Sequence, residues 1–325
     1  MGNQISFGDY EFQMKRKKSK KELFLEKMEK VVPFEKWCAI IRPFYYENGN
    51  GRQPIELESM LRMYLVSNWF NLSDEGTEEL VDDSRSVRSF VGRVAPDATT
   101  LCKFRLMLED NKLSQKIFLE QNKTFTEKGI LLREGTIVDA TIIECPKSKK
   151  NKEKSLPEGS ASTNKYGPIT GIKAHIGVDK KSGLVHSIAI TPANVSDVAM
   201  ASELLYGQEQ EVYGDSGYRG IDKREDVCEK LHDGTGEVIL LSHSHKRKPY
   251  YVLTTNTVFH IAQMKSKVTD DSLEKTKSRI RSKVEHIFLK LKHLFKYRKT
   301  RYRKAHKNEH HLFMLFTLAN LCKVA

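Results

Sequence analysis

One acidic and two basic residues near the C-terminus have a spacing that suits phosphate chemistry. Arg281, Glu285 and Lys292 stand at positions i, i+4 and i+11, so an α-helix would place all three on one side. A carboxylate between two cations suits a site for a metal ion and a phosphate. The same spacing also fits a solvated helix in which the Arg–Glu pair contributes only about 0.3 kcal/mol. A separate apolar stripe could pack this helix on a core: Ile280, Val284, Ile287, Leu291 and Leu294.

Two aspartates are candidates to join Glu285. Asp139 lies within residues 136–143, a run of β-branched residues that is typical of a buried strand. Asp215 ends a short apolar segment and has glycines close on both sides, which allow a sharp turn. In an α/β sheet, ligands bind beyond the carboxyl ends of the strands, where neighbouring strands bring side chains together. Three converging carboxylates repel one another unless a divalent cation neutralises them, and oxygen ligands suit Mg²⁺ or Mn²⁺.

Such a site would catalyse a displacement at phosphorus. Two divalent ions about 4 Å apart activate a water or a 3′-hydroxyl and stabilise the leaving oxygen. Taken singly, Asp139 is equally well interpreted as a strand-end aspartate held by backbone donors, and Asp215 as a turn residue. Their joint position, chain order and glycine context favour a site shared with Glu285.

The strands and helices expected around these residues occur in a characteristic order. Three strands are followed by a helix, a strand, a helix, a strand and a long final helix. That order predicts a ribonuclease-H-like α/β core, with a mixed five-stranded sheet whose first three strands form an antiparallel meander. Strands are expected at 136–143, 170–178, 184–191, 211–213 and 237–241, and helices at 197–206, 222–232 and 272–296.

An all-α domain is expected before this core. Apolar residues between 21 and 113 recur with helical spacing and indicate six helices. We therefore divide the chain into a basic flexible arm at 1–21, a helical domain at 22–130 for DNA binding or dimerisation, and a catalytic domain at 131–325. The last of these is expected to end in a basic helical tail.

The charge of the chain indicates an acidic partner. It carries 55 Lys and Arg against 42 Asp and Glu, a formal net charge of +13. Residues 276–311 alone hold 13 of the basic residues and two Glu. Nucleic-acid phosphates are the partner that such a block favours, with acidic lipid as the alternative. No apolar stretch approaches the roughly 20 residues of a membrane span, and no signal-peptide core is present, so we expect a soluble intracellular protein. Five widely separated cysteines without a CxxC spacing do not indicate a zinc or disulfide framework.

The residues around all three carboxylates carry a family resemblance. The chain resembles bacterial insertion-sequence transposases of the Asp-Asp-Glu (DDE) type, most closely the family named after insertion sequence five. The first aspartate of that family lies in a strand like residues 137–141, and the second in a Gly/Ala-Asp-x-Gly-Tyr turn like residues 214–218. Its glutamate lies in a Tyr-x2-Arg-x3-Glu-x6-Lys pattern, which Glu285 and its two basic neighbours match, although Ser278 replaces the tyrosine.

The resemblance implies a DNA transposase that cleaves the ends of an insertion element and joins them to target DNA. Asp139, Asp215 and Glu285 would hold two Mg²⁺ ions, for which Mn²⁺ may substitute. The implied partner is double-stranded DNA, at terminal inverted repeats and at the target. A homodimer in the synaptic complex follows from the need to join two ends, and the implied location is the bacterial cytoplasm, on the nucleoid when bound to DNA. The basic residues expected on DNA are Arg279, Arg281, Lys292, Arg301 and Arg303.

Two other functions remain open. A ribonuclease-H-like nuclease would share the carboxylates and lack strand transfer. A non-catalytic DNA-binding protein derived from a transposon would bind without cutting, although such proteins commonly lose their metal ligands.

Several other polar residues receive ordinary roles. We interpret Asp197 as a helix-start residue, because it follows a serine and precedes an apolar run. His175 is interpreted as a strand-partner histidine. The helical spacing of His306, His310 and His311 is assigned to a surface or DNA-facing helix rather than to a zinc site.

Overall fold

The computed structural model forms two compact units. The first comprises Met1–Asp110 with Leu321–Ala325, and the second Asn111–Asn320. Helix α8 (Leu113–Glu127) therefore falls in the second unit, although the sequence placed it with the N-terminal helices. The structure describes residues 17–45, 54–92, 96–145, 161–164, 167–231, 238–241, 250–253, 257–263 and 271–325.

Six helices precede residue 111 in the described chain, as the apolar spacing predicted. Helix α4 is buried around its circumference and forms the centre of the first unit, which explains its continuous apolar sequence. The six are α2 (Lys20–Val31), α3 (Phe34–Ile41), α4 (Leu57–Trp69), α5 (Asp74–Asp83), α6 (Arg85–Val91) and α7 (Ala98–Asp110).

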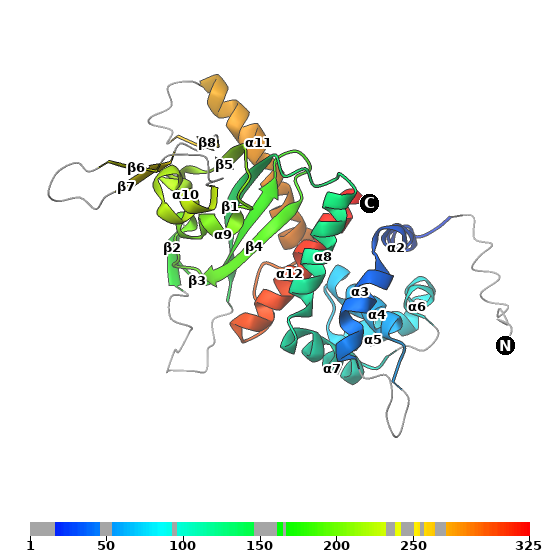
Figure 1. Ribbon diagram of the computed structural model, residues 1–325. Coiled ribbons are helices and arrows are strands. Elements are labelled where there is room, and N and C mark those ends of the chain that lie inside the picture. The colour runs from blue at the N-terminus through cyan, green and yellow to red at the C-terminus, as the bar shows by residue number, and fades with distance from the viewer. Residues whose placement is uncertain are drawn as a thin grey trace, which may run out of the picture. The chain divides into compact units, whose positions relative to one another are not determined.

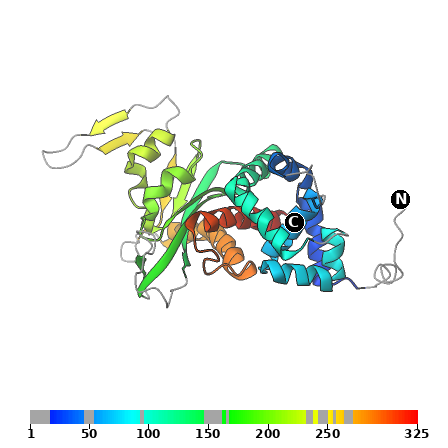
Figure 2. The ribbon, with the colours of Figure 1, turned by 90° about the horizontal axis from the view of Figure 1, so that it is seen from below.

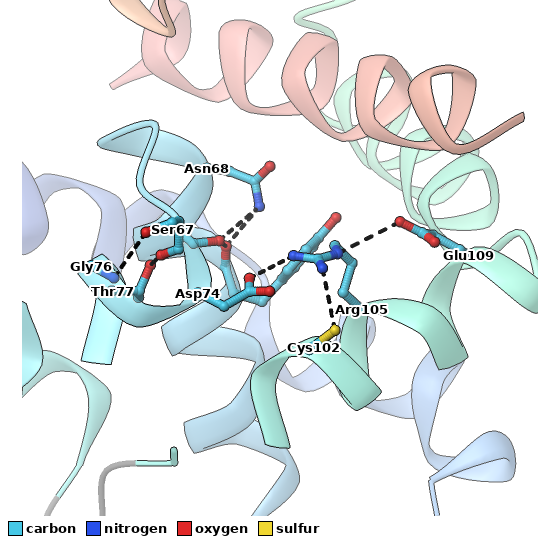
Figure 3. A network of polar contacts seen from close by, with 10 residues as sticks. Ser67, Asn68, Asp74, Gly76, Thr77, Cys102, Arg105 and Glu109 are labelled. Atoms are coloured by element: carbon cyan, nitrogen blue, oxygen red, sulfur yellow. Dashed lines mark hydrogen bonds and ion pairs between the residues drawn. The ribbon is translucent and has the colours of Figure 1, made fainter. Parts of the chain in front are cut away.

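A polar network joins α5 to α7 inside this unit (Figure 3). Arg105 Nη1 lies 2.5 Å from Asp74 Oδ1, and its Nε lies 3.7 Å from Glu109 Oε1. The Glu109 side chain is only 2% exposed. One guanidinium therefore neutralises two carboxylates that the fold removes from water.

The second unit is built on a mixed sheet in the order β4-β3-β1-β5-β8. Strands β1, β3 and β4 are antiparallel neighbours, and β5 and β8 run parallel to β1. A short strand β2 (Ala161–Asn164) pairs with the start of β3. This arrangement confirms the ribonuclease-H-like core. The five main strands are β1 (Gly135–Glu144), β3 (Gly167–Asp179), β4 (Val185–Pro192), β5 (Glu211–Gly214) and β8 (Val258–Ile261).

The fifth strand of the sheet is not the predicted segment 237–241. Strand β6 (Val238–Leu241) exists, but it pairs with β7 (Tyr250–Leu253) in a separate two-stranded sheet. The true fifth strand is β8, in which Phe259 and Ile261 alternate toward the core. Both segments are short, and we predicted the more apolar one, 237–241, because a sequence does not show which strands pair with each other.

Helices cover both faces of the sheet (Figures 1 and 2). On one face, α9 (Ala201–Leu204) and α10 (Glu225–Leu231) pack against Val138 and Val212. Helix α11 (Asp271–Leu289) packs on β1 and β5 and continues into a π-helical segment, Lys290–Leu294. This confirms the long helix expected at 272–296.

Helix α12 (Ala305–Val324) places two of its three histidines in the core and not on the surface, while His306 is exposed as predicted. His310 and His311 are buried, and His310 Nε2 accepts a hydrogen bond from the Ser114 backbone N–H at 3.3 Å. Asn320 closes two hydrogen bonds with the Val185 backbone, at 2.8 and 2.9 Å. Because the helix is apolar on every side after its first turns, it belongs in a core. No helix in the described ranges is both long enough and apolar enough to cross a membrane.

Candidate active site

The register of two parallel strands brings the predicted aspartates together. In the β1–β5 ladder, Gly135 pairs with Glu211 and Ile137 with Tyr213. The ladder ends there, two residues before Asp139 and Asp215, and the charge of Asp215 acts on Asp139. Neighbouring strands are about 4.8 Å apart, so the two carboxylates share one end of the sheet.

Asp139 lies in an environment that disfavours its charge. Val138 faces the core formed with α9 and α10, so strand alternation directs Asp139 to the face on which α11 packs. Burial raises the pKa of Asp139 to about 6, and the charge of Asp215 adds to the rise. A hydrogen bond of 2.8 Å from the Ala140 N–H and the nearby Arg281 oppose it. A cation close to Asp139 would therefore favour the ionised form.

Asp215 is positioned by the turn that follows β5. It caps a short 3₁₀ helix, Ser216–Tyr218, and its Oδ1 accepts a hydrogen bond of 2.8 Å from the Gly217 N–H. A methyl group on Gly217 would lie 2.9 Å from Asp215 Oδ1 and 3.4 Å from Asp197 Oδ2. The glycine therefore leaves space for two carboxylates to approach the same point.

Glu285 does not join this pair within the described residues. Val284 and Ile287 bury one side of α11, and Glu285 is exposed at its edge. Arg281, one turn earlier on that edge, is partly buried, acts on Asp139, and has an Nε atom with no hydrogen-bond partner among the described residues. Within the part of the chain that the structure describes, no three His, Cys, Asp or Glu side chains are close enough to hold one metal ion.

The predicted DNA-binding residues follow α11 toward the end of β1. Lys292 lies in the π-helical segment, where burial lowers its pKa and the charge of Glu144 opposes that shift. The next stretch of chain runs beside Glu144, whose N–H donates to Arg298 O at 3.3 Å and whose carbonyl accepts from the Thr300 N–H at 2.8 Å. Arg279, Arg301 and Arg303 are exposed.

Sequence reasoning gave Asp197 and His175 only local roles and did not single out Lys173. Asp197 opens a 3₁₀ helix, Asp197–Met200, as a helix-start residue should. However, its Oδ1 also lies 2.9 Å from Lys173 Nζ and 3.8 Å from His175 Nδ1. His175 stands opposite Ala140 in the β1–β3 register, and burial lowers its pKa to about 4. The strand-partner role of His175 is confirmed, while its proximity to Asp197 depends on a β3 register that the sequence does not reveal.

Comparison with known proteins identifies the class to which this fold and site belong. Residues 131–321 match the family described as "Transposase DDE domain", and residues 12–106 match "Transposase domain (DUF772)". A solved structure, the cryo-EM structure of the piggyBac transposase synaptic complex with hairpin DNA, is 11% identical, with 93% of this chain and 74% of that chain covered at a TM-score of 0.39.

The chain belongs to the DDE transposase family. It is an insertion-sequence DNA transposase, a polynucleotidyl transferase and endonuclease that depends on divalent metal and acts on DNA. The residues present fit that requirement. Their donors are all oxygen atoms, which suit hard divalent cations, and Asp139 ionises reluctantly without a compensating positive charge.

Proposed function

We propose that Asp139, Asp215 and Glu285 form the metal-binding triad of this transposase, with two Mg²⁺ ions and Mn²⁺ as a substitute. The observation that supports the proposal is the β1–β5 pairing, which ends two residues before Asp139 and Asp215, together with the effect of the Asp215 charge on the pKa of Asp139. Glu285 completes the set because it lies on the same edge of α11 as Arg281, whose charge acts on Asp139.

The carboxylates and Arg281 have different tasks in this proposal. Bound divalent ions lower the pKa of the attacking water or 3′-hydroxyl and stabilise the leaving oxygen. Asp139 and Asp215 fix the site on a rigid sheet edge, and the Gly217 N–H holds the Asp215 carboxylate in place. Arg281 presents a guanidinium beside them, which suits two parallel hydrogen bonds to the scissile phosphate.

Lys292, Arg279, Arg301 and Arg303 are proposed to bind the DNA backbone. Their side chains carry no base-specific arrangement, and contacts to phosphate fix the register of a protein on DNA. Lys292 is partly buried near the end of β1, and the other three are exposed.

The reaction proceeds in two displacements. Water first nicks the end of the element, and the freed 3′-hydroxyl then attacks target DNA. We propose a homodimer in the synaptic complex, because two element ends must be joined, and terminal inverted repeats as the DNA that it recognises. The chain fits best among transposases of the insertion sequence five family, in the cytoplasm of a bacterium and on its nucleoid when DNA is bound.

The test is end cleavage and strand transfer by the purified protein on DNA that bears the repeats flanking its own gene. Asp215→Ala is assayed beside it, with Asp222→Ala, an exposed aspartate of the same unit, as the matched control. We expect nicks at the repeat ends that join to a second DNA in Mg²⁺, absent only in Asp215→Ala.

Each contrary outcome is informative. Cleavage without joining would assign a nuclease, and binding without cleavage in both Mg²⁺ and Mn²⁺ would assign a non-catalytic DNA-binding protein. Activity that survives Asp215→Ala would show that the triad is misassigned.

A further inference from the structure

Asp197 offers a third carboxylate beside Asp139 and Asp215. Its Oδ1 forms an ion pair with Lys173 Nζ at 2.9 Å but is buried and makes no hydrogen bond within the described residues, whereas the same ammonium donates to Val195 O at 2.7 Å. Its Oδ2 faces the space beside Gly217 that Asp215 Oδ1 also faces. The Asp197 side chain is 30% exposed, so one oxygen is held by protein while the carboxylate still reaches solvent.

A buried hydroxyl nearby has no partner to explain it. Tyr218 is fully buried, and its hydroxyl makes no hydrogen bond within the described residues. Burial raises the pKa of Tyr218, and the charges of Asp139, Asp197 and Asp215 all add to the rise. Buried hydroxyls nearly always have a partner, so an unsatisfied one beside three carboxylates indicates that a ligand or its water belongs between them.

We propose that Asp197 is a further catalytic residue, whose Oδ2 binds the divalent cation, or a water of its coordination shell, together with Asp139 and Asp215. The proposal rests on the metal site proposed above and adds a ligand to it. These side chains stand farther apart than the ligands of one ion do. Binding therefore draws them together or leaves Asp197 connected through water, as is usual for Mg²⁺.

Lys173 gives Asp197 a defined orientation. The ion pair with the Lys173 ammonium favours one orientation of the Asp197 carboxylate and offsets part of the repulsion from Asp139 and Asp215. Asp197 is thus in place before any DNA binds, whereas Glu285 is still in solvent. We expect the ion held by the three aspartates to bind without DNA and without Glu285.

Mn²⁺ binding to the full-length protein without DNA tests this directly, with free Mn²⁺ followed by electron paramagnetic resonance. Outer-shell partners of a metal typically change its affinity by about 10–100-fold. Asp197→Asn should therefore weaken Mn²⁺ binding by at least about 10-fold, and Lys173→Met by a smaller factor. The matched control Asp222→Asn should bind like the wild type.

The outcomes separate this inference from the function on which it rests. If Asp139→Asn and Asp215→Asn lose Mn²⁺ while Asp197→Asn binds like the wild type, Asp197 is only structural and the metal site stands. If Asp139→Asn and Asp215→Asn also bind like the wild type, the metal site itself is misplaced.

A stability measurement excludes a folding defect as the cause. Mn²⁺ should raise the midpoint of thermal unfolding of the wild type, because a ligand of the native state stabilises it. Asp197→Asn should lose most of that increase while its midpoint in EDTA stays close to that of the wild type. A lower midpoint in EDTA with an unchanged Mn²⁺ increase would overturn the proposal.

Discussion

Two clusters of charged side chains, one in each unit, are built in opposite ways. In the first unit, Arg105 lies between Asp74 and Glu109, and both carboxylates are within 4 Å of its guanidinium. In the second, Asp139 and Asp215 lie side by side, and neither forms an ion pair within the described residues.

This difference in charge pairing indicates that the cluster in the first unit is structural and the cluster in the second unit is functional. The first cluster pairs its charges and can only contribute to stability. The second cluster places like charges close together, which lowers the stability of the folded protein. A bound cation would neutralise these charges, so the arrangement indicates a functional site. Substitutions should therefore affect folding in one cluster and catalysis in the other.

The largest expected effect is on catalysis in the second cluster. Asp139→Asn preserves shape and the acceptor for the Ala140 N–H, but it removes a proposed metal ligand. We expect strand cleavage to fall by about 10²–10³-fold or more, the scale of losing one electrostatic group at a reacting centre. The free energy of unfolding in EDTA should not fall, because a like charge has been removed.

Asp74→Asn, in the cluster of the first unit, is the converse control: it tests whether a change in that cluster affects stability but not catalysis. It weakens the pair with Arg105 in the other unit, so stability should fall while cleavage by the folded fraction persists. A loss of cleavage in Asp74→Asn that exceeds its unfolded fraction would show that the two clusters are not separate in function.

A smaller effect is expected from removing the cation of the first cluster. Arg105→Met removes the cation that contacts both carboxylates, in a site where the Arg105 and Asp74 side chains are 15% and 21% exposed. The free energy of unfolding should fall by about 3 kcal/mol, measured by urea denaturation. Arg88→Met is the matched control, because its pair with Asp82 is largely exposed and should contribute less than about 1 kcal/mol. Equal losses in the two variants would mean that the buried cluster is no better paired than the surface.

The pH dependence of stability sharpens the comparison further. The pKa of Asp139 is about 6 in the folded protein, against about 3.9 in an unfolded chain. Between these values the native state binds more protons, so the free energy of unfolding falls as pH rises. In EDTA the wild type should lose roughly 1–2 kcal/mol relative to Asp139→Asn from about pH 4 to about pH 6, after allowance for solvent screening.

Denaturation curves of both proteins across that range provide the measurement. A difference that does not change with pH would show that Asp139 is ionised as easily as an exposed aspartate.

The sequence predicted the paired aspartates because both signals are local. A β-branched run around Asp139 and a glycine-flanked strand end at Asp215 fix their places on two strands, and the order of elements makes those strands neighbours. The helix that carries Glu285 was equally visible from its apolar stripe. The position of the Glu285 side chain could not be predicted from the sequence, because it depends on a ligand and on neighbouring residues from distant parts of the chain.

The residues that sequence reasoning missed depend on contacts between distant segments. Asp197 received a local role, which it has, but its ion pair with Lys173 follows from the register of β3 and the path of the chain after β4. The prediction of β6 and not β8 as the fifth strand was wrong for the same reason, because strand pairing depends on contacts with distant partner strands and not on the composition of the strand itself.

The smallest expected effects concern the exposed cations beyond the second cluster. Arg279, Arg301 and Arg303 are proposed to contact phosphates, and each contact releases about one counterion from DNA. Arg303→Gln should weaken binding by a few-fold, equally for repeat and unrelated DNA, and reduce the slope of log K against log salt by about 1. Lys123→Gln, an exposed cation on α8, should leave the slope unchanged. Because Arg303 carries no metal ligand, cleavage at saturating DNA should persist, and its loss would place Arg303 in the catalytic site rather than on the flanking DNA.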